Sequence, residues 1–422
     1  MKKKVLSTLF GALLLCLCTG CGDTTGDATK GDAAGTTNNE VTQTGPIKLT
    51  VWAEEDNFAM LETMIDSFKK ANPSETFEFT LEAQGDGTLR DVALGDVHNT
   101  ADVFHFPDDQ LNSLAAGGIL SEVSDATTIR SANTEASVNA ASINGKIYAY
   151  PMTADNGYFL YYNKKYFTED DVKTMDGILA VAAKHGKKLT MELNSGWYLY
   201  SFFGNTNLDF GLNDDGVTNY CNWNATEGAI TGLHVATAIN KIINHAGFRT
   251  SADGNFLPDA EQDIVIAAVS GVWNAIGVRE VWGEDYGAVK LPTYTCNGTQ
   301  VQMASFTGYK MVGVNSYSEH LEWAHKFAAW ITNEENQTLR FVERNQGPSN
   351  IKAAASDEVL KVPAIQAVID QSQYGVLQRV GNHYWGPCTT FIDTLVAGNP
   401  GGKSLQELLD DLVAGITASA VN

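Results

Sequence analysis

The sequence predicts an α/β fold divided into two lobes. The chain has 422 residues, which is longer than a single hydrophobic core usually serves, so two domains are expected. A strand pattern at Ile47–Trp52 is followed by helical spacing and a second strand pattern at Phe77–Leu81, the order that opens an α/β lobe. Two further strand patterns, Ile147–Tyr150 and Tyr158–Tyr162, are joined by a short polar passage, as a link between lobes would be.

Composition and charge restrict the class of protein. A hydrophobic content of 44% with 10% aromatic residues is typical of a globular protein. The formal net charge is −22, so the phosphates of a nucleic acid would be repelled. The eight histidines show no H-E-x-x-H motif and no clustered ligand spacing. We therefore expect no metal site, no cofactor and no nucleic-acid partner.

Residues 1–20 have the features of a secretory signal. Three lysines precede an apolar run, Val5–Leu17, that is too short to span a bilayer, and small residues precede Cys21. This ending resembles the bacterial lipobox, although Cys18 stands where leucine is usual, and it implies cleavage before Cys21 and lipidation of Cys21. Residues 21–46 carry almost no large apolar side chain, so we interpret them as the anchored cysteine and a flexible linker.

Three other cysteines, Cys221, Cys296 and Cys388, remain in the mature chain. An odd number permits at most one disulfide among them. Buried free thiols are the simpler interpretation, and the sequence leaves any pairing open.

The elements of the first lobe follow directly from the pattern. Apolar residues at helical spacing from Leu61 to Phe68 predict a helix that ends before Asn72-Pro73. Ala101–Pro107 is the next strand, and Leu111–Leu120 predicts a helix after it.

The middle of the chain contains a hairpin signal and a break. Asn144-Gly145 predicts a type I′ turn before Ile147–Tyr150. Pro151 has no backbone donor, so the strand is expected to end there or to lie at a sheet edge.

The second half alternates strands and helices in the same way. Five tryptophans are expected to pack in the cores: Trp52, Trp223, Trp282, Trp323 and Trp330.

The segment Gly145–Phe167, with its G-K-x-Y-x-x-P and Y-Y-N-K-x-x-F stretches, resembles the extracellular solute-binding proteins of ABC importers, in the maltose and oligosaccharide branch. Tyr286–Pro292 is similar to that family's Y-G-V-x-x-L-P strand. The resemblance implies a type II periplasmic-binding-protein fold with the ligand cleft between its lobes. It places residues 47–154 with 309–346 in lobe 1, and residues 155–308 with 347–422 in lobe 2. Hinge crossings are expected near Ala154–Asn156, Phe306–Tyr309 and Gln346–Pro348.

The resemblance also implies which residues line the cleft. The polar candidates are Glu55, Asp56, Asp108, Asp155 and Asn156. The aromatic candidates are Phe106, Trp197, Trp273, Tyr384 and Trp385. This chain departs from the branch at Ser195-Gly196, where a carboxylate usually stands, and that weakens the expectation of a maltose-like set of contacts.

The function implied is capture of an oligosaccharide, most closely a malto-oligosaccharide, and its delivery to an ABC permease. Sugars have apolar C–H faces that stack on aromatic rings, so several aromatics along one groove favour an oligosaccharide over a small polar solute. The protein is expected to be a monomer, held on the outer face of the bacterial cell membrane through Cys21, and to catalyse no reaction.

Other functions stay open. Adjacent carboxylates such as Glu54-Glu55 and Asp108-Asp109 admit a lipid-anchored glycoside hydrolase, although 50 acidic residues produce adjacent pairs by chance. Ala397–Ser404 approaches a nucleotide-binding P-loop, but the residues before it have helical rather than strand spacing. A solute-binding protein for a non-sugar solute, and an adhesin that needs no permease, are further alternatives.

Overall fold

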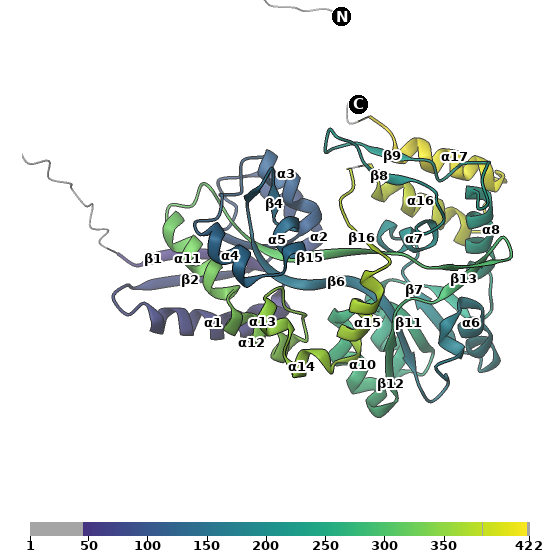
Figure 1. The fold of residues 1–422 in the computed structure, drawn as a ribbon, viewed down its shortest axis with the longest axis horizontal. Coiled ribbons are helices and arrows are strands. Elements are labelled where there is room, and N and C mark those ends of the chain that lie inside the picture. Colours follow the sequence, from purple (N-terminus) through teal and green to yellow (C-terminus); the bar gives the residue numbers. More distant parts are fainter. Residues whose placement is uncertain (1–44, 382, 420–422) are drawn as a thin grey trace, which may run out of the picture. The chain divides into compact units, whose positions relative to one another are not determined.

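Most strands of the protein join into one sheet that runs through the whole described chain (Figure 1). The computed structural model describes residues 45–381 and 383–419, so the predicted signal, the lipidation of Cys21 and the linker up to Thr44 lie outside the described residues. The order in the ten-stranded sheet is β10-β7-β11-β6-β15-β3-β1-β2, with β12 paired to β6 and β16 paired to β15. These strands are β1 (Ile47–Ala53), β2 (Phe77–Ala83), β3 (Val103–Pro107), β6 (Tyr150–Asn163), β7 (Lys188–Met191), β10 (Phe248–Thr250), β11 (Val265–Gly271), β12 (Tyr286–Val289), β15 (Ser305–Val314) and β16 (Gly375–Leu377).

One end of the sheet is built from parallel strands with a helix between them. β1 pairs in parallel with β2 from Ile47–Phe77 to Ala53–Ala83, and also with β3. The helix α1 (Phe58–Ala71) turns Met60, Leu61, Met64, Ile65 and Phe68 inward, as the apolar spacing predicted. The other helices of this end are α2 (Asp86–Gly95), α3 (Leu111–Ala116), α4 (Ala126–Ala132), α5 (Glu135–Ala140), α11 (Leu321–Ile331) and α12 (Glu334–Arg344).

The predicted type I′ hairpin is present. It joins β4 (Ser142–Ile143) to β5 (Lys146–Ile147), and both turn residues have positive φ, 50° at Asn144 and 79° at Gly145. Asparagine and glycine tolerate this left-handed backbone, which is why the sequence signal was reliable.

The middle of the sheet is made by two long antiparallel strands, β6 and β15. The expectation that Pro151 ends a strand was wrong, because β6 runs unbroken from Tyr150 to Asn163. The β6–β15 ladder shifts register twice, between Gly308 and Lys310 and between Lys310 and Met311, and Pro151 lies opposite Met311 at the second shift. The segment after α12 also lies against β6, since Thr153 bridges Pro348 and the Ala154 N–H donates to the Gly347 carbonyl at 2.9 Å. Three chain segments, β6, β15 and residues 346–348, therefore lie side by side in the middle of the sheet, and we call this place the crossing.

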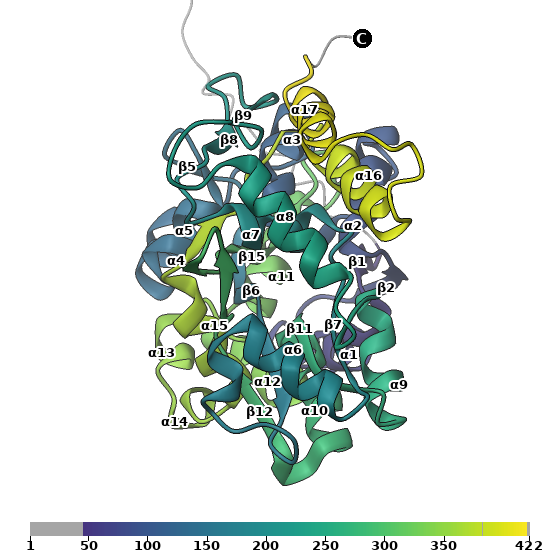
Figure 2. The same cartoon turned by 90° about the vertical axis from the view of Figure 1, so that its right-hand side faces the viewer.

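The other end of the sheet has β7 at its centre, paired in parallel with β10 and β11. Its helices are α6 (Met175–Lys184), α7 (Gly196–Phe203), α8 (Gly232–Ile243), α9 (Phe256–Glu261), α10 (Ala275–Trp282), α15 (Pro363–Ser372), α16 (Trp385–Val396) and α17 (Leu405–Ile416). The short helices α13 (Ile351–Ala354), which contacts α12, and α14 (Asp357–Leu360) lead from the first end to α15 (Figure 1). Two small hairpins complete it: β8 (Phe210–Leu212) with β9 (Asn219–Cys221), and β13 (Thr293–Cys296) with β14 (Thr299–Gln302). Figure 2 shows α8 crossing the near face of this end, with α16 and α17 above it and α6 below. Residues 397–404 form the loop between α16 and α17, so no strand precedes the P-loop-like sequence.

In the described part of the chain, six single-turn 3-10 helices connect these elements. They are η1 (Glu55–Asn57), η2 (Asp108–Gln110), η3 (Asp171–Lys173), η4 (Asp253–Asn255), η5 (Val272–Asn274) and η6 (Gly283–Asp285).

The buried apolar side chains form three clusters. One draws on residues 47–152 and 311–331, and the other two on residues 158–416. Trp52, Trp223 and Trp282 are buried, and Trp323 and Trp330 pack half-buried against the first cluster. Cys221, Cys296 and Cys388 are free thiols. No helix in the described part of the chain is long and apolar enough to cross a membrane. The predicted lobe boundaries stay a prediction.

Candidate ligand-binding site

A cavity of about 990 Å³ lies where the carboxyl ends of the strands meet. Glu54, Glu55 and Asp56 follow β1, and Pro107, Asp109 and Gln110 follow β3. From the other end of the sheet, Glu192 follows β7, Asp253 follows β10, and Trp273 follows β11. Loops after the carboxyl ends of parallel strands meet at one edge of a sheet, which is where α/β proteins bind ligands.

One wall of the cavity is aromatic. Trp197 at the start of α7 stacks on Phe306 of β15, with ring centroids 5.6 Å apart and an interplanar angle of 24°. Trp385 at the start of α16 also contacts Phe306, at 6.5 Å and 58°. Phe306 is itself buried, so it fixes both indoles from behind. Trp273 is the most exposed of the three indoles, with 38% of its surface accessible.

Trp273 is held by a carboxylate network. Its Nε1 donates to Asp253 Oδ2 at 2.8 Å, and the Asn274 amide donates to the same oxygen at 3.0 Å. The other carboxylate oxygen of Asp253 accepts from Ser270 Oγ at 2.6 Å. The backbone N–H of Asp253 in turn donates to Glu192 at 2.9 Å. The Tyr198 hydroxyl also donates to Asp253 Oδ1, at 3.4 Å. Besides the indole, four partners (Asn274, Ser270, Glu192 and Tyr198) therefore orient Asp253, and Asp253 orients the indole.

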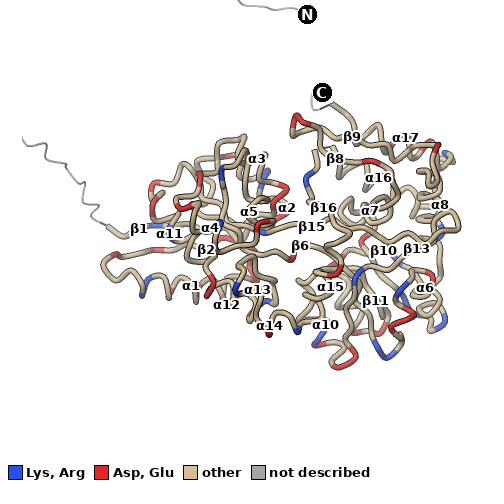
Figure 3. Tube along the Cα trace, viewed as in Figure 1, with Lys and Arg blue, Asp and Glu red and all other residues tan. Residues whose placement is uncertain are grey.

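The opposite wall is charged. Lys310 of β15 pairs with Asp86 at 2.7 Å and lies 3.9 Å from Glu54, and only 19% of its side chain is exposed. Burial lowers the pKa of Lys310, but the Asp86 and Glu54 carboxylates outweigh burial and raise it overall, so its ammonium stays charged. Arg344 pairs with Asp56 at 3.2 Å. Seven carboxylates and three cationic side chains line the cavity, and Figure 3 shows acidic segments beside α2. The cavity therefore disfavours an anionic solute.

Two carboxyl groups beside the crossing hold protons unusually strongly. Burial, followed by the neighbouring charge of Asp108, raises the pKa of Asp109 to about 8, although Gln378 donates to it at 2.9 Å. Burial raises the pKa of Asp108 to about 7, although the Tyr309 N–H donates to it at 2.8 Å. The cause is the same in both cases, because a charged carboxylate loses its hydration there.

A family model for bacterial extracellular solute-binding proteins matches residues 63–367, most of the chain. The chain belongs to this family. The solute-binding protein is 26% identical over 381 residues to the galactooligosaccharide-binding protein of Bacillus subtilis (strain 168), a match that covers 84% of this chain and 86% of the relative. It is also 26% identical over 380 residues to a maltooligosaccharide ABC transporter solute-binding lipoprotein of Streptococcus pneumoniae serotype 4, covering 85% and 86%.

Solved structures resemble this solute-binding protein over nearly their full length. A chain solved with acarbose has a TM-score of 0.79 and 27% identity, and the match covers 88% of this chain and 99% of that one. The maltodextrin-binding protein of L. casei BL23, solved without ligand, has a TM-score of 0.74 and 22% identity, covering 89% and 100%. These likenesses confirm the predicted fold class, a two-lobed α/β solute-binding protein.

The structure brings together six of the ten predicted site residues of the solute-binding protein. Those that line the cavity are Glu55, Asp56, Asn156, Trp197, Trp273 and Trp385. Their contact with a ligand stays a prediction.

The remaining four predicted residues do not line the cavity, which differs from the expectation. Asp108 and Asp155 are buried and accept backbone hydrogen bonds, from the N–H groups of Tyr309 and Gly347. Tyr384 is fully buried, and its hydroxyl donates to the Gly196 carbonyl at 2.8 Å. Phe106 is fully buried as well, because every residue of β3 is covered on both faces of the sheet. In all four cases the next residue in the chain lines the cavity instead: Pro107, Asp109, Asn156 and Trp385.

Sequence reasoning missed several lining residues. Asp253 is in a polar turn after the short strand β10, and that position was a usable signal. Lys310 was also detectable, since a lone charge inside an apolar strand is uncommon unless it is paired. Glu192 and Gln378 had no comparable signal.

Proposed function

We propose that this solute-binding protein captures an oligosaccharide, most closely a malto-oligosaccharide, and delivers it to an ABC permease. The observation that carries the proposal is the arrangement of three indoles, Trp197, Trp273 and Trp385, around one cavity that also has a carboxylate-rich wall. The two relatives are named for galactooligosaccharide and maltooligosaccharide, and these names support the same class of ligand.

The chemistry of the cavity suits a neutral sugar chain. Stacking one sugar face on an indole removes roughly 50–60 Å² of apolar surface from water, which contributes about 1.5 kcal/mol per ring at ~25 cal/mol per Å². Carboxylates such as Glu55 and amides such as Asn156 accept and donate hydrogen bonds to the hydroxyl groups, and those made to a charged group are the stronger. The excess of carboxylates disfavours acidic sugars.

Capture works by closure of the two walls around the crossing of β6, β15 and residues 346–348. The ligand contacts residues on both walls, so it binds the closed arrangement better and shifts the population toward it. The protein acts from the outer face of the cell membrane, where the lipid on Cys21 keeps it near the permease. Both the anchor and the permease are parts of the proposal.

Calorimetric titration of the mature protein tests the proposal. We expect saturable binding to at least one member of a panel of α- and β-linked oligosaccharides, and no binding of a uronic-acid oligomer. The absence of binding to every neutral oligosaccharide, together with a thermal-shift response to an ion or amine, would favour a non-sugar solute.

The hydrolase alternative has one favourable observation. Asp109 lines the cavity with a pKa of about 8, raised first by burial, and a protonated carboxyl at neutral pH is what a general acid needs. Incubation with the bound oligosaccharide separates the two functions. New reducing ends that disappear in Asp109→Asn would establish hydrolysis, and an intact sugar supports capture alone.

A further inference from the structure

The helix that carries Trp197 begins without a side-chain cap. Ser195, the residue before α7, has extended backbone, and its side chain accepts no hydrogen bond from the first turn. Many helices are fixed at this end by such a cap, because their first N–H groups have no partner within the helix. The first turn of α7 nevertheless carries an indole of the aromatic wall. The position of this turn therefore depends on contacts from outside the helix.

Two buried tyrosine hydroxyls hold the first two residues of α7. The Tyr384 hydroxyl donates to the Gly196 carbonyl, and the Tyr158 hydroxyl donates to the Trp197 carbonyl, both at 2.8 Å. Both tyrosines are fully buried, and they come from distant parts of the chain, just before α16 and within β6. Leaving a buried carbonyl without its donor costs free energy, so these two bonds define where the first turn lies.

The Tyr158 hydroxyl also joins α7 to the middle of the sheet. The β6–β15 ladder ends at the pair of Gly157 with Thr307, and just beyond it the Phe306 N–H donates to the Tyr158 hydroxyl at 3.3 Å. The Tyr158 ring meets the Trp197 indole edge to face, with centroids 5.3 Å apart and an interplanar angle of 64°. One phenol therefore contacts the backbone and the ring of Trp197, and also the residue whose ring supports that indole from behind.

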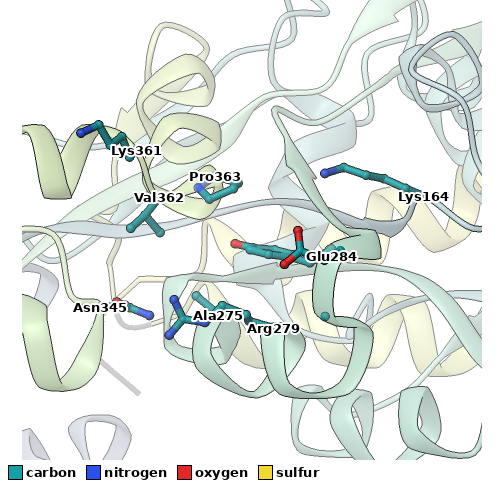
Figure 4. A pocket seen from close by; sticks show the side chains of 10 residues that line it. Lys164, Ala275, Arg279, Glu284, Asn345, Lys361, Val362 and Pro363 are labelled. Atoms are coloured by element: carbon teal, nitrogen blue, oxygen red, sulfur yellow. The ribbon is translucent and has the colours of Figure 1, made fainter.

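The other side of β6 packs elsewhere. Side chains alternate along a strand, and Phe159 and Tyr161 belong to a different apolar cluster, together with Ala275. Ala275 also lines a second cavity, of about 460 Å³, with Lys164 at the end of β6 (Figure 4). This second cavity shares no lining residue with the first. The contacts that hold the start of α7 therefore come from the Tyr158 side of β6.

We propose that Tyr158 and Tyr384 are positioning residues of the oligosaccharide site. Both hydroxyls fix Trp197 in the cavity, and Tyr158 also fixes Phe306 and, through its ring, Trp385. The inference rests on the proposed function, and neither tyrosine contacts the ligand, because both are fully buried. An indole that is held in place before binding loses less conformational entropy when a sugar stacks on it.

Calorimetric titration of the mature protein with the bound oligosaccharide tests the proposal. Tyr158→Phe and Tyr384→Phe each remove one hydroxyl and keep the ring, and we expect each to weaken binding by roughly threefold or more. Tyr294→Phe is the matched control. Tyr294 is also fully buried, and its hydroxyl donates to the Phe202 carbonyl near the other end of α7. This variant loses an equivalent bond to the same helix and is expected to keep full affinity, since Tyr294 does not line the cavity.

A fluorine spectrum of the free protein separates positioning from a general loss of stability. Fluorinated tryptophan gives one resonance for each of the eight indoles, and Trp197→Ala and Trp385→Ala identify two of them. We expect Tyr158→Phe and Tyr384→Phe to shift or broaden the Trp197 resonance, and Tyr158→Phe to move the Trp385 resonance as well. Tyr294→Phe is expected to leave both resonances in place.

Unchanged affinity in Tyr158→Phe or Tyr384→Phe overturns the role of that residue. An equal loss of affinity in Tyr294→Phe, or a Trp197 resonance that moves in neither variant, overturns the proposal as a whole. Failure of the proposed function is a separate result. If the unmodified protein binds no oligosaccharide, the fluorine spectra, recorded without ligand, still decide whether the two hydroxyls place the indole.

Discussion

The indole Nε1 of Trp273 donates a 2.8 Å hydrogen bond to the carboxylate of Asp253, a residue twenty positions earlier in the chain. The bond joins the loop after β10 to the loop after β11, at the edge of the first cavity. It holds the most exposed of the three indoles in a single orientation before any ligand arrives. A ring that is already oriented loses less conformational entropy on binding, so we expect the Asp253 carboxylate to contribute indirectly to the proposed oligosaccharide affinity.

Replacing Asp253 with alanine is therefore expected to weaken oligosaccharide binding by roughly three- to tenfold, since each ordered side chain costs about 0.5–1.5 kcal/mol. In this variant the Trp273 ring is expected to stay in place but to rotate more freely. Calorimetry of Asp253→Ala, Trp273→Ala and the double variant forms a thermodynamic cycle. The effects are expected to be less than additive. Strict additivity would mean that Asp253 does not act through Trp273.

Trp197→Ala and Trp385→Ala are each expected to weaken oligosaccharide binding by about tenfold, which corresponds to the ~1.5 kcal/mol of one stacked ring. Trp323→Ala is the control, because Trp323 packs against the first core outside the cavity. It is expected to lower stability and leave affinity unchanged. Unchanged calorimetric affinity in both cavity variants would remove the stacking argument.

Stability is expected to fall as the pH rises from about 4 to about 8. Burial raises the pKa of Asp155 to about 6, of Asp108 to about 7 and of Asp109 to about 8, from an ordinary 3.8. In this window the folded protein retains protons that the unfolded chain has released, so raising the pH favours unfolding. The midpoint of thermal unfolding should be higher at about pH 5 than at about pH 8, by roughly 3 °C or more.

A single variant isolates this effect from the general repulsion of an acidic chain. The variant Asp109→Asn has an amide that cannot titrate at this position, so it should make the dependence on pH less steep, most clearly above about pH 7, whereas Asp66→Asn, which removes an exposed carboxylate, should not. A midpoint that rises with pH in the unmodified protein would contradict the assignment.

Lys310→Met is expected to lower the free energy of unfolding by about 3 kcal/mol, because it leaves the largely buried Asp86 carboxylate without its partner. Lys48→Met is the matched control. The Lys48–Glu78 pair spans 3.5 Å with side chains 72% and 59% exposed, so its loss should cost only about 0–1 kcal/mol. Urea denaturation measures both, and equal losses would show that burial of the Lys310 pair is unimportant.

Local sequence patterns predicted the order of the elements well. The α1 stripe from Leu61 to Phe68 and the Asn144-Gly145 turn are set by residues close together in the chain, so a local pattern suffices. The position of Pro151 inside β6 is instead defined by pairing with β15, whose opposite residue, Met311, lies more than 150 residues away in the chain. No local signal carries that information.

The sequence predicted which chain segments line the candidate site, but not which of two neighbouring side chains in each segment points into the cavity. Asp155 and Asn156 are neighbours in β6, where side chains alternate between faces, and the cavity receives Asn156 while Asp155 turns to Gly347. Choosing between them requires knowing which face of β6 is covered by residues 346–348. The same holds for Tyr384 and Trp385. Trp385 lines the cavity, whereas Tyr384 is buried against Gly196, which leaves room for the tyrosine ring. A side chain at Gly196 would collide with it.

The two register shifts within Gly308–Met311 have a mechanical consequence. They interrupt the β6–β15 ladder over a few residues, while β15 stays regularly paired to β16 through Ser305–Thr307 and to β3 through Lys310–Val314. In the proposed closure, we expect this short segment to flex while the loops that carry the indoles and carboxylates keep their shape. Related solute-binding proteins would then differ in ligand by changing the side chains that line the cavity, while the proposed hinge segment and its motion stay the same.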